Sequence, residues 1–270
     1  MTPCDDTVLG HHRPAATLWG KGGRDYDDAS FSISDALAHA AQGLNARQGE
    51  RILDIGHRDR LVRPQCGTQG SGGDGCGHRP LALRRCRRSF GAYMATRRVS
   101  PRRCGKLPFD DGAFDGVIST FGVMFAANQA EAAAELARVC RSGGRLVLAT
   151  WAQDGAVAKF FGVIARYSDA PPPRSSPLAW GNPPYVKQLL GDSFELEFEH
   201  GVSNTCHGGV EDIWQWYTRG FGPLRQLVES LPLDRVQQLK RDVDVYHRHY
   251  AVPAGLHVKR EYLITLGRRR

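Results

Sequence analysis

The sequence lacks any apolar run of the roughly 18 residues that a transmembrane helix requires. Its first ten residues are polar and acidic, without the apolar segment of a secretory signal. The seven cysteines include none of the closely spaced C-x2-4-C pairs that structural zinc sites use. We therefore expect a soluble cytoplasmic protein with reduced thiols, no bound metal and no membrane partner.

Acidic residues are nearly missing between residues 57 and 105. That segment holds twelve arginines, two aspartates, no lysine and no glutamate, so it carries a larger positive surplus than the whole chain, whose net charge is +8. The rest of the sequence is slightly acidic, and the basic character belongs to one segment. The segment shows neither helical nor strand periodicity, and its composition indicates an irregular or disordered region.

A glycine-rich turn is missing where one is expected. Residues 51–56 form an apolar run with Asp54 and Gly56 at its end, which is typical of the first strand at a nucleotide-type cofactor site. Glycine lets the backbone approach a ligand because it has no Cβ, but residues 57–64 contain three arginines and a proline instead. Without a G-x-G-x-x-G turn, a dinucleotide-dependent oxidoreductase is a weaker alternative.

Regular elements are predicted on both sides of this segment. Helical spacing covers residues 32–44, 156–167, 185–190 and 234–250, and strand patterns cover residues 51–56, 114–120, 145–150, 194–199 and 258–266. Asn128 and Glu131 form a capping pattern for a helix that runs through Cys140, with Gly143 at its carboxyl end. Strand, helix and strand in succession predict a crossover connection and a parallel sheet.

These elements resemble, in order and spacing, a class I S-adenosylmethionine-dependent methyltransferase. The string R-I-L-D-I-G at 51–56 matches the family's first strand, and L-P-F-D-D-G-A-F-D at 107–115 leads into its fourth. The strings A-A-A-E-L-A-R-V-C at 132–140 and G-G-R-L-V-L at 143–148 match the helix and strand that follow. The resemblance implies an α/β fold with a Rossmann-like, seven-stranded sheet, mostly parallel, with an antiparallel carboxyl-terminal strand pair.

The same resemblance implies the domain organisation. Residues 1–30 are expected to form an irregular arm, residues 31–151 the methyltransferase core, and residues 152–270 a substrate-pocket insertion followed by the last strands of the same domain. Within the core, the family pattern places a glycine turn, a helix and two strands in residues 57–105, where none is evident.

A shifted reading frame explains this gap. Reading the degenerate codons one nucleotide out of frame permits a T-G-T-G-W-S-A-R string after Gly56 and the string F-R-L-G-D-A-E over residues 99–105. We therefore interpret the segment as the product of two compensating frameshifts near residues 57 and 105, in the gene or in its sequencing. A genuine arginine-rich insertion is the alternative.

The resemblance implies S-adenosyl-L-methionine as the cofactor. The positions it carries over are Tyr26, Asp54, Gly56, Leu107, Ser119, Thr120 and Phe121. Each also has an ordinary structural explanation, such as strand-end packing or a core leucine, and Asp115 is expected to be structural. Arg79 and Arg103 align where the family has acids for the ribose and adenine. Because a guanidinium only donates hydrogen bonds, we expect impaired cofactor binding.

The acceptor is expected to be a small molecule. Residues 155–217 are rich in proline and aromatics, and they are inserted where the family often builds its substrate pocket. Met124, Phe125, Trp180, Trp214 and Tyr217 either line such an apolar pocket or are core side chains. No residue stands out as a catalytic base, and the methylated atom and the oligomeric state are not identified.

Two other functions are compatible with the sequence. An inactive methyltransferase-like protein would keep the fold without the cofactor turn. An arginine-rich nucleic-acid-binding module would use the twelve arginines on phosphates. Only Phe90 and Tyr93 supply aromatic side chains there, whereas single-strand binders interleave aromatics with their basic residues. A nucleic-acid partner is therefore disfavoured.

Overall fold

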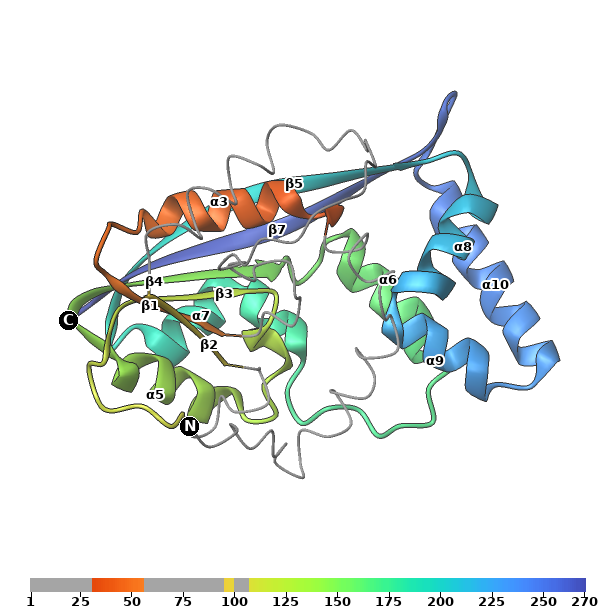
Figure 1. Cartoon of the computed structure of the whole chain (residues 1–270). Coiled ribbons are helices and arrows are strands. Elements are labelled where there is room, and N and C mark those ends of the chain that lie inside the picture. The colour runs from red at the N-terminus through yellow and green to blue at the C-terminus, as the bar shows by residue number, and fades with distance from the viewer. Residues whose placement is uncertain (1–30, 56–94, 100–106) are drawn as a thin grey trace, which may run out of the picture.

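The structure is a computed structural model that describes residues 31–55, 95–99 and 107–270 (Figure 1). Its strands are β1 (Arg51–Ile55), β2 (Ala95–Val99), β3 (Phe114–Thr120), β4 (Cys140–Trp151), β5 (Phe194–His207), β6 (Ala251–Val252) and β7 (Gly255–Arg269). The helices are α3 (Ser34–Leu44), α5 (Gln129–Val139), α6 (Ala156–Ala165), α7 (Pro183–Leu190), α8 (Val210–Gly220), α9 (Gly222–Ser230) and α10 (Leu233–Arg248). Two short 3-10 helices are η4 (Val123–Phe125) and η5 (Pro177–Gly181).

One mixed sheet organises these elements. Its strand order is β2-β1-β3-β4-β7-β5, with β6 beside β7. The neighbours from β2 to β4 are parallel, and β7 is antiparallel to β4, β5 and β6. This arrangement confirms the predicted Rossmann-like sheet with an antiparallel carboxyl-terminal pair. The seventh strand is the two-residue β6, and the described residues contain one strand beyond β1 where the family pattern expects two.

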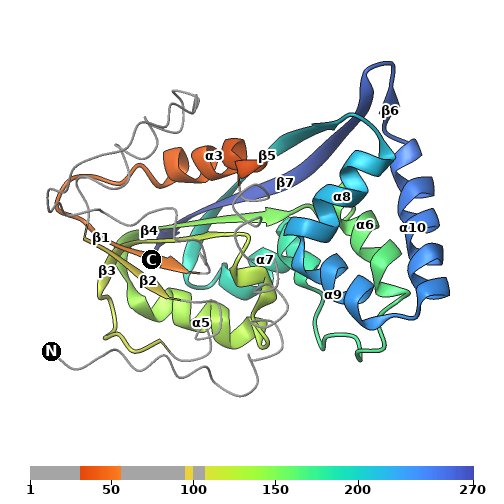
Figure 2. The ribbon, with the colours of Figure 1, turned by 45° about the vertical axis from the view of Figure 1, so that its right-hand side comes forward.

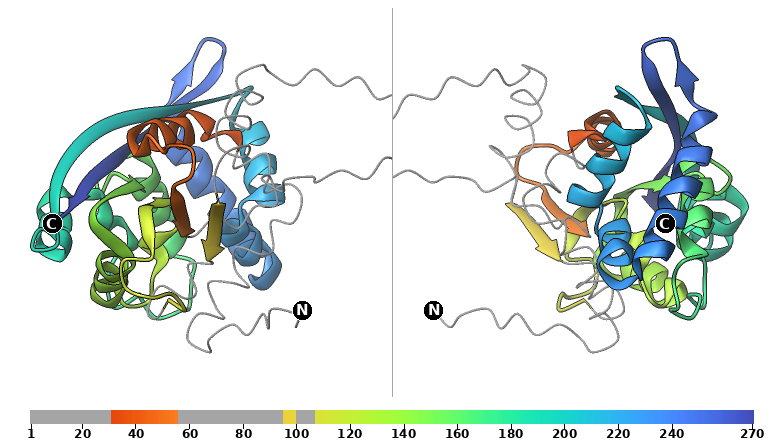
Figure 3. Two further views of the ribbon diagram at one scale, coloured as in Figure 1. Left: turned by 60° about the vertical axis from the view of Figure 1, so that its left-hand side comes forward. Right: turned by 90° about the vertical axis from the view of Figure 1, so that its right-hand side faces the viewer.

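Helices cover both faces of the sheet. Helix α3 lies on one face, α5 and α7 lie on the other, and α6, α8, α9 and α10 gather beyond the carboxyl end of β4 (Figures 1 and 2). We call these last four helices the cap. β5 curves along the outside of β7, and both strands continue past the sheet toward the cap (Figure 3).

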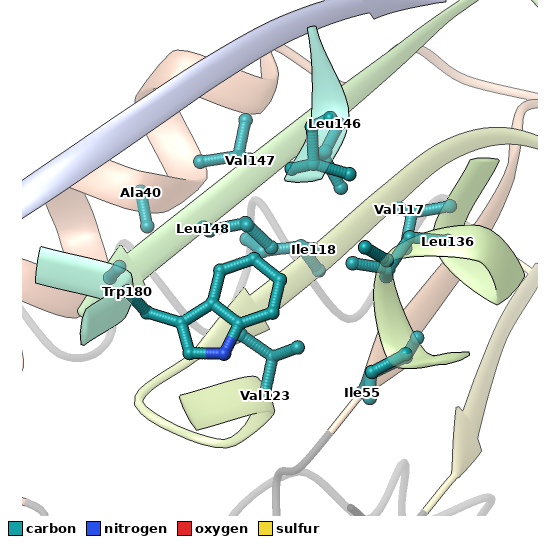
Figure 4. Packing of buried hydrophobic residues seen from close by; sticks show 14 of the residues in the cluster. Ala40, Ile55, Val117, Ile118, Val123, Leu136, Leu146, Val147, Leu148 and Trp180 are labelled. Atoms are coloured by element: carbon teal, nitrogen blue, oxygen red, sulfur yellow. The ribbon is translucent and has the colours of Figure 1, made fainter. Parts of the chain in front are cut away.

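The main core forms because apolar positions recur with the period of each element. Helix α3 buries Ala36, Ala40 and Leu44, spaced one turn apart, against the sheet. Strand β3 is buried on both faces, as expected for a central parallel strand. Figure 4 shows Ile118 of β3 and Leu148 of β4 among the buried side chains of this core. A second cluster fills the cap, and its buried members are Phe160, Ile164, Tyr167, Trp214, Leu224, Leu239 and Val243.

Three features differ from the sequence-based expectations. Residues 95–99 form β2, parallel to β1, although the segment 57–105 shows no strand pattern. Gly143 lies within β4 at φ +70°, because α5 ends at Val139 and Cys140 is already extended. The pairing of β3 with β4 shifts register there, so this glycine belongs to a bulge rather than to a helix end. Helices α8 and α9 were not predicted as helices.

None of the helices in the described residues is both long and apolar enough to cross a membrane.

Candidate functional site

The carboxyl ends of β1, β3 and β4 meet at one edge of the sheet, where ligands bind in open α/β folds. Ser119 joins two of these ends. Its buried hydroxyl donates to the Ile55 carbonyl at 2.6 Å and accepts from the Val123 amide at 2.9 Å. The side chain therefore fixes the end of β1 against the turn that follows β3.

That turn contains an unusual backbone conformation. Phe121 has φ +56°, and its amide donates to the Ala149 carbonyl at 2.8 Å. A bulky residue in this left-handed region costs about 1–3 kcal/mol, so other contacts must hold it there. Its ring stacks on Trp151 with the centroids 4.1 Å apart and meets the ring of Tyr262 edge-on at 6.5 Å. Strain of this kind clusters at functional sites, and here it shapes the carboxyl edge.

Asp54 and Thr120 are half-buried near the same edge. The backbone of Asp54 pairs with Ile118 on one side, and Thr120 is the last residue of β3. Tyr26 and Gly56 lie outside the described residues, as do Arg79 and Arg103. The structure therefore brings together Asp54, Ser119, Thr120 and Phe121 from the predicted cofactor set.

Leu107 has a packing position before β3. Its side chain is buried in the main core. Its amide donates to the Glu135 carboxylate at 2.7 Å, and its carbonyl accepts from Arg138 at 3.0 Å. Arg138 also donates to the Phe109 carbonyl at 2.6 Å, so α5 clamps the whole L-P-F stretch.

Asp115 acts at the opposite edge, near the start of β3. Its carboxylate accepts from the Arg51 amide and from Arg141 Nε, both at 2.8 Å. These hydrogen bonds lower the pKa of the Asp115 carboxyl from its usual value. The contacts fasten β3 to β1 and β4, as expected for a structural acid.

The five predicted acceptor-pocket residues fall into two groups. Met124 and Trp180 are fully buried in the main core, and Phe125 packs against it. Trp214 and Tyr217 belong to the cap.

Trp180 lies beside Val123 and Leu148 (Figure 4). Its carbonyl accepts from the Thr150 hydroxyl at 2.9 Å, while its indole nitrogen has no hydrogen-bond partner within the described chain.

A tyrosine–histidine pair lies inside the cap. The Tyr217 hydroxyl is 3.4 Å from Nε2 of the fully buried His247, and His247 Nδ1 is 2.7 Å from the Val243 carbonyl. A carbonyl only accepts, so Nδ1 carries the proton and Nε2 accepts from Tyr217. Burial lowers the pKa of His247 to about 4 and raises the pKa of Tyr217. Both groups are therefore neutral at pH 7.

Sequence reasoning missed three residues at the carboxyl edge: Trp151, Arg260 and Tyr262. The guanidinium of Arg260 lies 5.8 Å from the Trp151 ring centroid. A signal for Arg260 was present, because it occupies an inward position of the alternating run 258–266. Among the described residues, no cluster of three His, Cys, Asp or Glu side chains is placed to hold a metal ion.

Comparisons with known proteins agree with this fold. A family model described as "Methyltransferase domain" matches residues 79–148. An uncharacterised protein of Mycobacterium tuberculosis H37Rv, Rv1405c, is 31% identical over 225 residues, covering 81% of this chain and 80% of that protein. A demethylmenaquinone methyltransferase of Mycolicibacterium gilvum is 47% identical over 60 residues, which are 21% of this chain and 26% of that enzyme.

Solved structures show the same architecture. A protein of Bacillus halodurans C-125 with a provisional methyltransferase assignment has a TM-score of 0.50 at 17% identity, covering 86% of this chain and 97% of its own. The YcgJ protein of Bacillus subtilis also has a TM-score of 0.50, at 15% identity, with 88% and 99% covered. Residues 79–148 therefore match a methyltransferase domain, and the sheet order and strand-end motifs are those of the class I S-adenosylmethionine-dependent methyltransferase fold.

Proposed function

We propose that this protein transfers a methyl group from S-adenosylmethionine to a small-molecule acceptor. The observation that carries the proposal is the carboxyl edge, where Ser119 fixes the end of β1 and the strained Phe121 stacks on Trp151. The cofactor supplies an activated methyl group, and the protein's part is to align the acceptor with it.

The described residues fit this cofactor at the end of β1. Asp54 is a half-buried carboxylate there, and a carboxylate can accept hydrogen bonds from an ammonium group such as that of a methionine moiety. Ser119 holds the Ile55 carbonyl next to it, so the strand end is fixed before a ligand arrives. The four helices of the cap gather beyond the carboxyl end of β4, next to this edge, where they can enclose a small organic acceptor more readily than a macromolecule.

We further infer that cofactor binding is impaired in this chain, and that the cause is a frameshifted segment at residues 57–105. The support is the sequence itself, which has arginines where the family pattern has a glycine turn and two acids. We also propose a cytoplasmic location, where the free thiols of Cys140 and Cys206 would stay reduced.

Calorimetric titration with S-adenosylhomocysteine tests both parts. The chain should show no binding in the micromolar range, and a variant restored by the two one-nucleotide corrections should bind. A micromolar constant for the unaltered chain would refute the impairment. Failure of the restored variant to bind would refute the methyltransferase proposal itself, and resequencing the gene checks the frame directly.

Acceptor classes can then be screened with the restored variant. Demethylmenaquinone belongs in the panel because one relative is named for it, although that match covers only 21% of this chain. With a radiolabelled methyl group on the cofactor, label transferred to each small molecule can be compared with label transferred to nucleic acid. This comparison would distinguish a small-molecule methyltransferase from an enzyme that modifies nucleic acid.

A further inference from the structure

Arg260 lies on β7 just past the point where β4 ends. Tyr262 pairs with Trp151, the last residue of β4, and Arg260 precedes Tyr262 by two residues. Its neighbour across the ladder is Ser203 of β5. Arg260 is therefore at the carboxyl edge of the parallel strands, where ligands bind in folds of this kind.

The Arg260 side chain is buried, and it donates only to neutral oxygens. Arg260 is 8% exposed. Nη1 donates to Ser32 Oγ at 3.1 Å, Nη2 donates to the Ser32 carbonyl and to Ser203 Oγ, and Nε donates to the Ser203 carbonyl at 3.5 Å. A guanidinium has five N–H groups, so these bonds leave one for another acceptor.

No carboxylate balances this charge directly within the described chain, where no ion pair involves Arg260. The Asp35 carboxylate reaches Arg260 only through the Ser203 hydroxyl, which donates to Asp35 at 2.8 Å and accepts from Arg260 Nη2 at 3.1 Å. Burial lowers the pKa of Arg260, while Tyr217 and Asp35 act in the opposite direction. Buried charges in proteins are normally paired, and arginine stays protonated at neutral pH.

The surroundings of Arg260 suit an organic anion. The guanidinium carbon lies 5.8 Å from the centroid of Trp151, and the Trp151 ring stacks on Phe121 at 4.1 Å. These buried rings lie beside the cation, so they would flank an anionic group that meets the guanidinium.

We propose that Arg260 recognises a carboxylate on the methyl acceptor, with Trp151 and Phe121 beside the acceptor's apolar part. This inference rests on the proposed function and narrows its substrate class to small organic anions. The competing explanation is a purely structural arginine that fastens Ser32, just before α3, to β5. That explanation requires no ligand, so the two make different predictions.

Benzoate and its neutral counterpart benzamide are suitable probes, followed by NMR of the arginine Nε–H resonances. The Arg260 resonance is assigned in the wild-type chain by its nuclear Overhauser effects to Ser203 and Trp151, which lie next to the guanidinium. Benzoate should shift this resonance in the wild-type chain, and benzamide should not. Benzoate binding should weaken about tenfold or more in Arg260→Gln, since a charge-assisted hydrogen bond is lost. It should be unchanged in Arg268→Gln, which alters an exposed arginine on the same strand.

Several results would overturn the assignment. The first test uses the wild-type chain alone, so it does not depend on whether a variant folds. An Arg260 resonance that millimolar benzoate leaves unmoved would refute the proposal directly. Equal benzoate affinity in Arg260→Gln, with its fold verified by circular dichroism, would do the same. Equal shifts from benzoate and benzamide would show that charge is not recognised.

The cofactor also has a carboxylate, so its role must be separated from that of the acceptor. In the frame-restored variant, Arg260→Gln should leave the affinities for S-adenosylhomocysteine and for methylthioadenosine, which has no carboxylate, unchanged. Weaker binding of S-adenosylhomocysteine alone would assign Arg260 to the cofactor and overturn the acceptor assignment. If neither nucleoside binds while benzoate still engages Arg260, the proposed function fails and the anion site stands.

Discussion

Acidification should destabilise this protein through one buried side chain, His247. Its pKa falls from 6.5 to about 4 on folding, because a fully buried imidazole is held neutral. The unfolded chain therefore binds a proton between pH 6.5 and 4 that the folded chain does not, so stability is present above pH 6.5 and is lost as the pH falls. Linkage gives a loss of about 2 kcal/mol between pH 7 and pH 5 from this group alone.

The charged and titratable groups around His247 do not change that sign. Tyr217 and Tyr246 are neutral in this range, since burial raises the pKa of both. His207 lowers the pKa of His247 further, and Asp244 opposes this only weakly beside the dominant effect of burial. The net result is a neutral imidazole whose Nε2 accepts from Tyr217.

Urea unfolding of the wild type and of His247→Gln from pH 7.5 to 5 measures the effect. Glutamine can keep one hydrogen bond but does not titrate. The free energy of unfolding of His247→Gln should therefore fall by about 2 kcal/mol less than that of the wild type over this pH interval. Carboxylates contribute equally to both proteins and cancel in the difference. Parallel pH profiles for the two proteins would refute the reasoning, because they would mean that His247 has the same pKa folded and unfolded.

Two further predictions concern the carboxyl edge and its supports. Ser119→Ala leaves the Ile55 carbonyl and the Val123 amide without their buried partner, so it should lower the free energy of unfolding, measured with denaturant, by about 1–3 kcal/mol. Ser142→Ala, at an exposed hydroxyl, is the control, and equal stability of both variants would contradict the role assigned to Ser119. Gly181→Ala would place a Cβ 1.9 Å from the Trp151 carbonyl oxygen, so the melting temperature of this variant should be much lower than that of the wild type, whereas Gly162→Ala on α6 meets open space and should be neutral or stabilising. A Gly181→Ala variant as stable as the wild type would show that the backbone at this position moves easily.

Local patterns were sufficient to predict the core elements. The start of α5 is one case, because the Glu131 amide donates to Asn128 Oδ1 at 3.2 Å, as the capping pattern predicts. The strands at residues 51–56 and 114–120 were recognisable from continuous apolar runs, since central parallel strands are buried on both faces. The prediction that Gly143 ends the helix was wrong, because a glycine with positive φ occurs both at helix ends and in strand bulges. The sequence pattern alone does not distinguish these two cases.

The site depends on contacts that the sequence does not reveal. Trp180, Trp214 and Tyr217 were predicted to line one apolar pocket or to be core side chains, and the fold places Trp180 in the main core and the other two in the cap. His247 continues the buried side of α10 one turn beyond Val243, and that spacing was available in the sequence. The burial of Arg260 was not available, because it depends on Ser32 and Ser203, which are far away along the chain.

The hydrogen-bonded ladder of β5 and β7 has an evolutionary consequence. The chain leaves this ladder after His207 and returns opposite it at Leu256, so α8, α9, α10 and β6 form the connection at the last pair of the ladder. Such an excursion can be lengthened, exchanged or trimmed to a tight hairpin while every rung below it is preserved. The sheet and its carboxyl edge can therefore stay fixed in a lineage while this excursion changes.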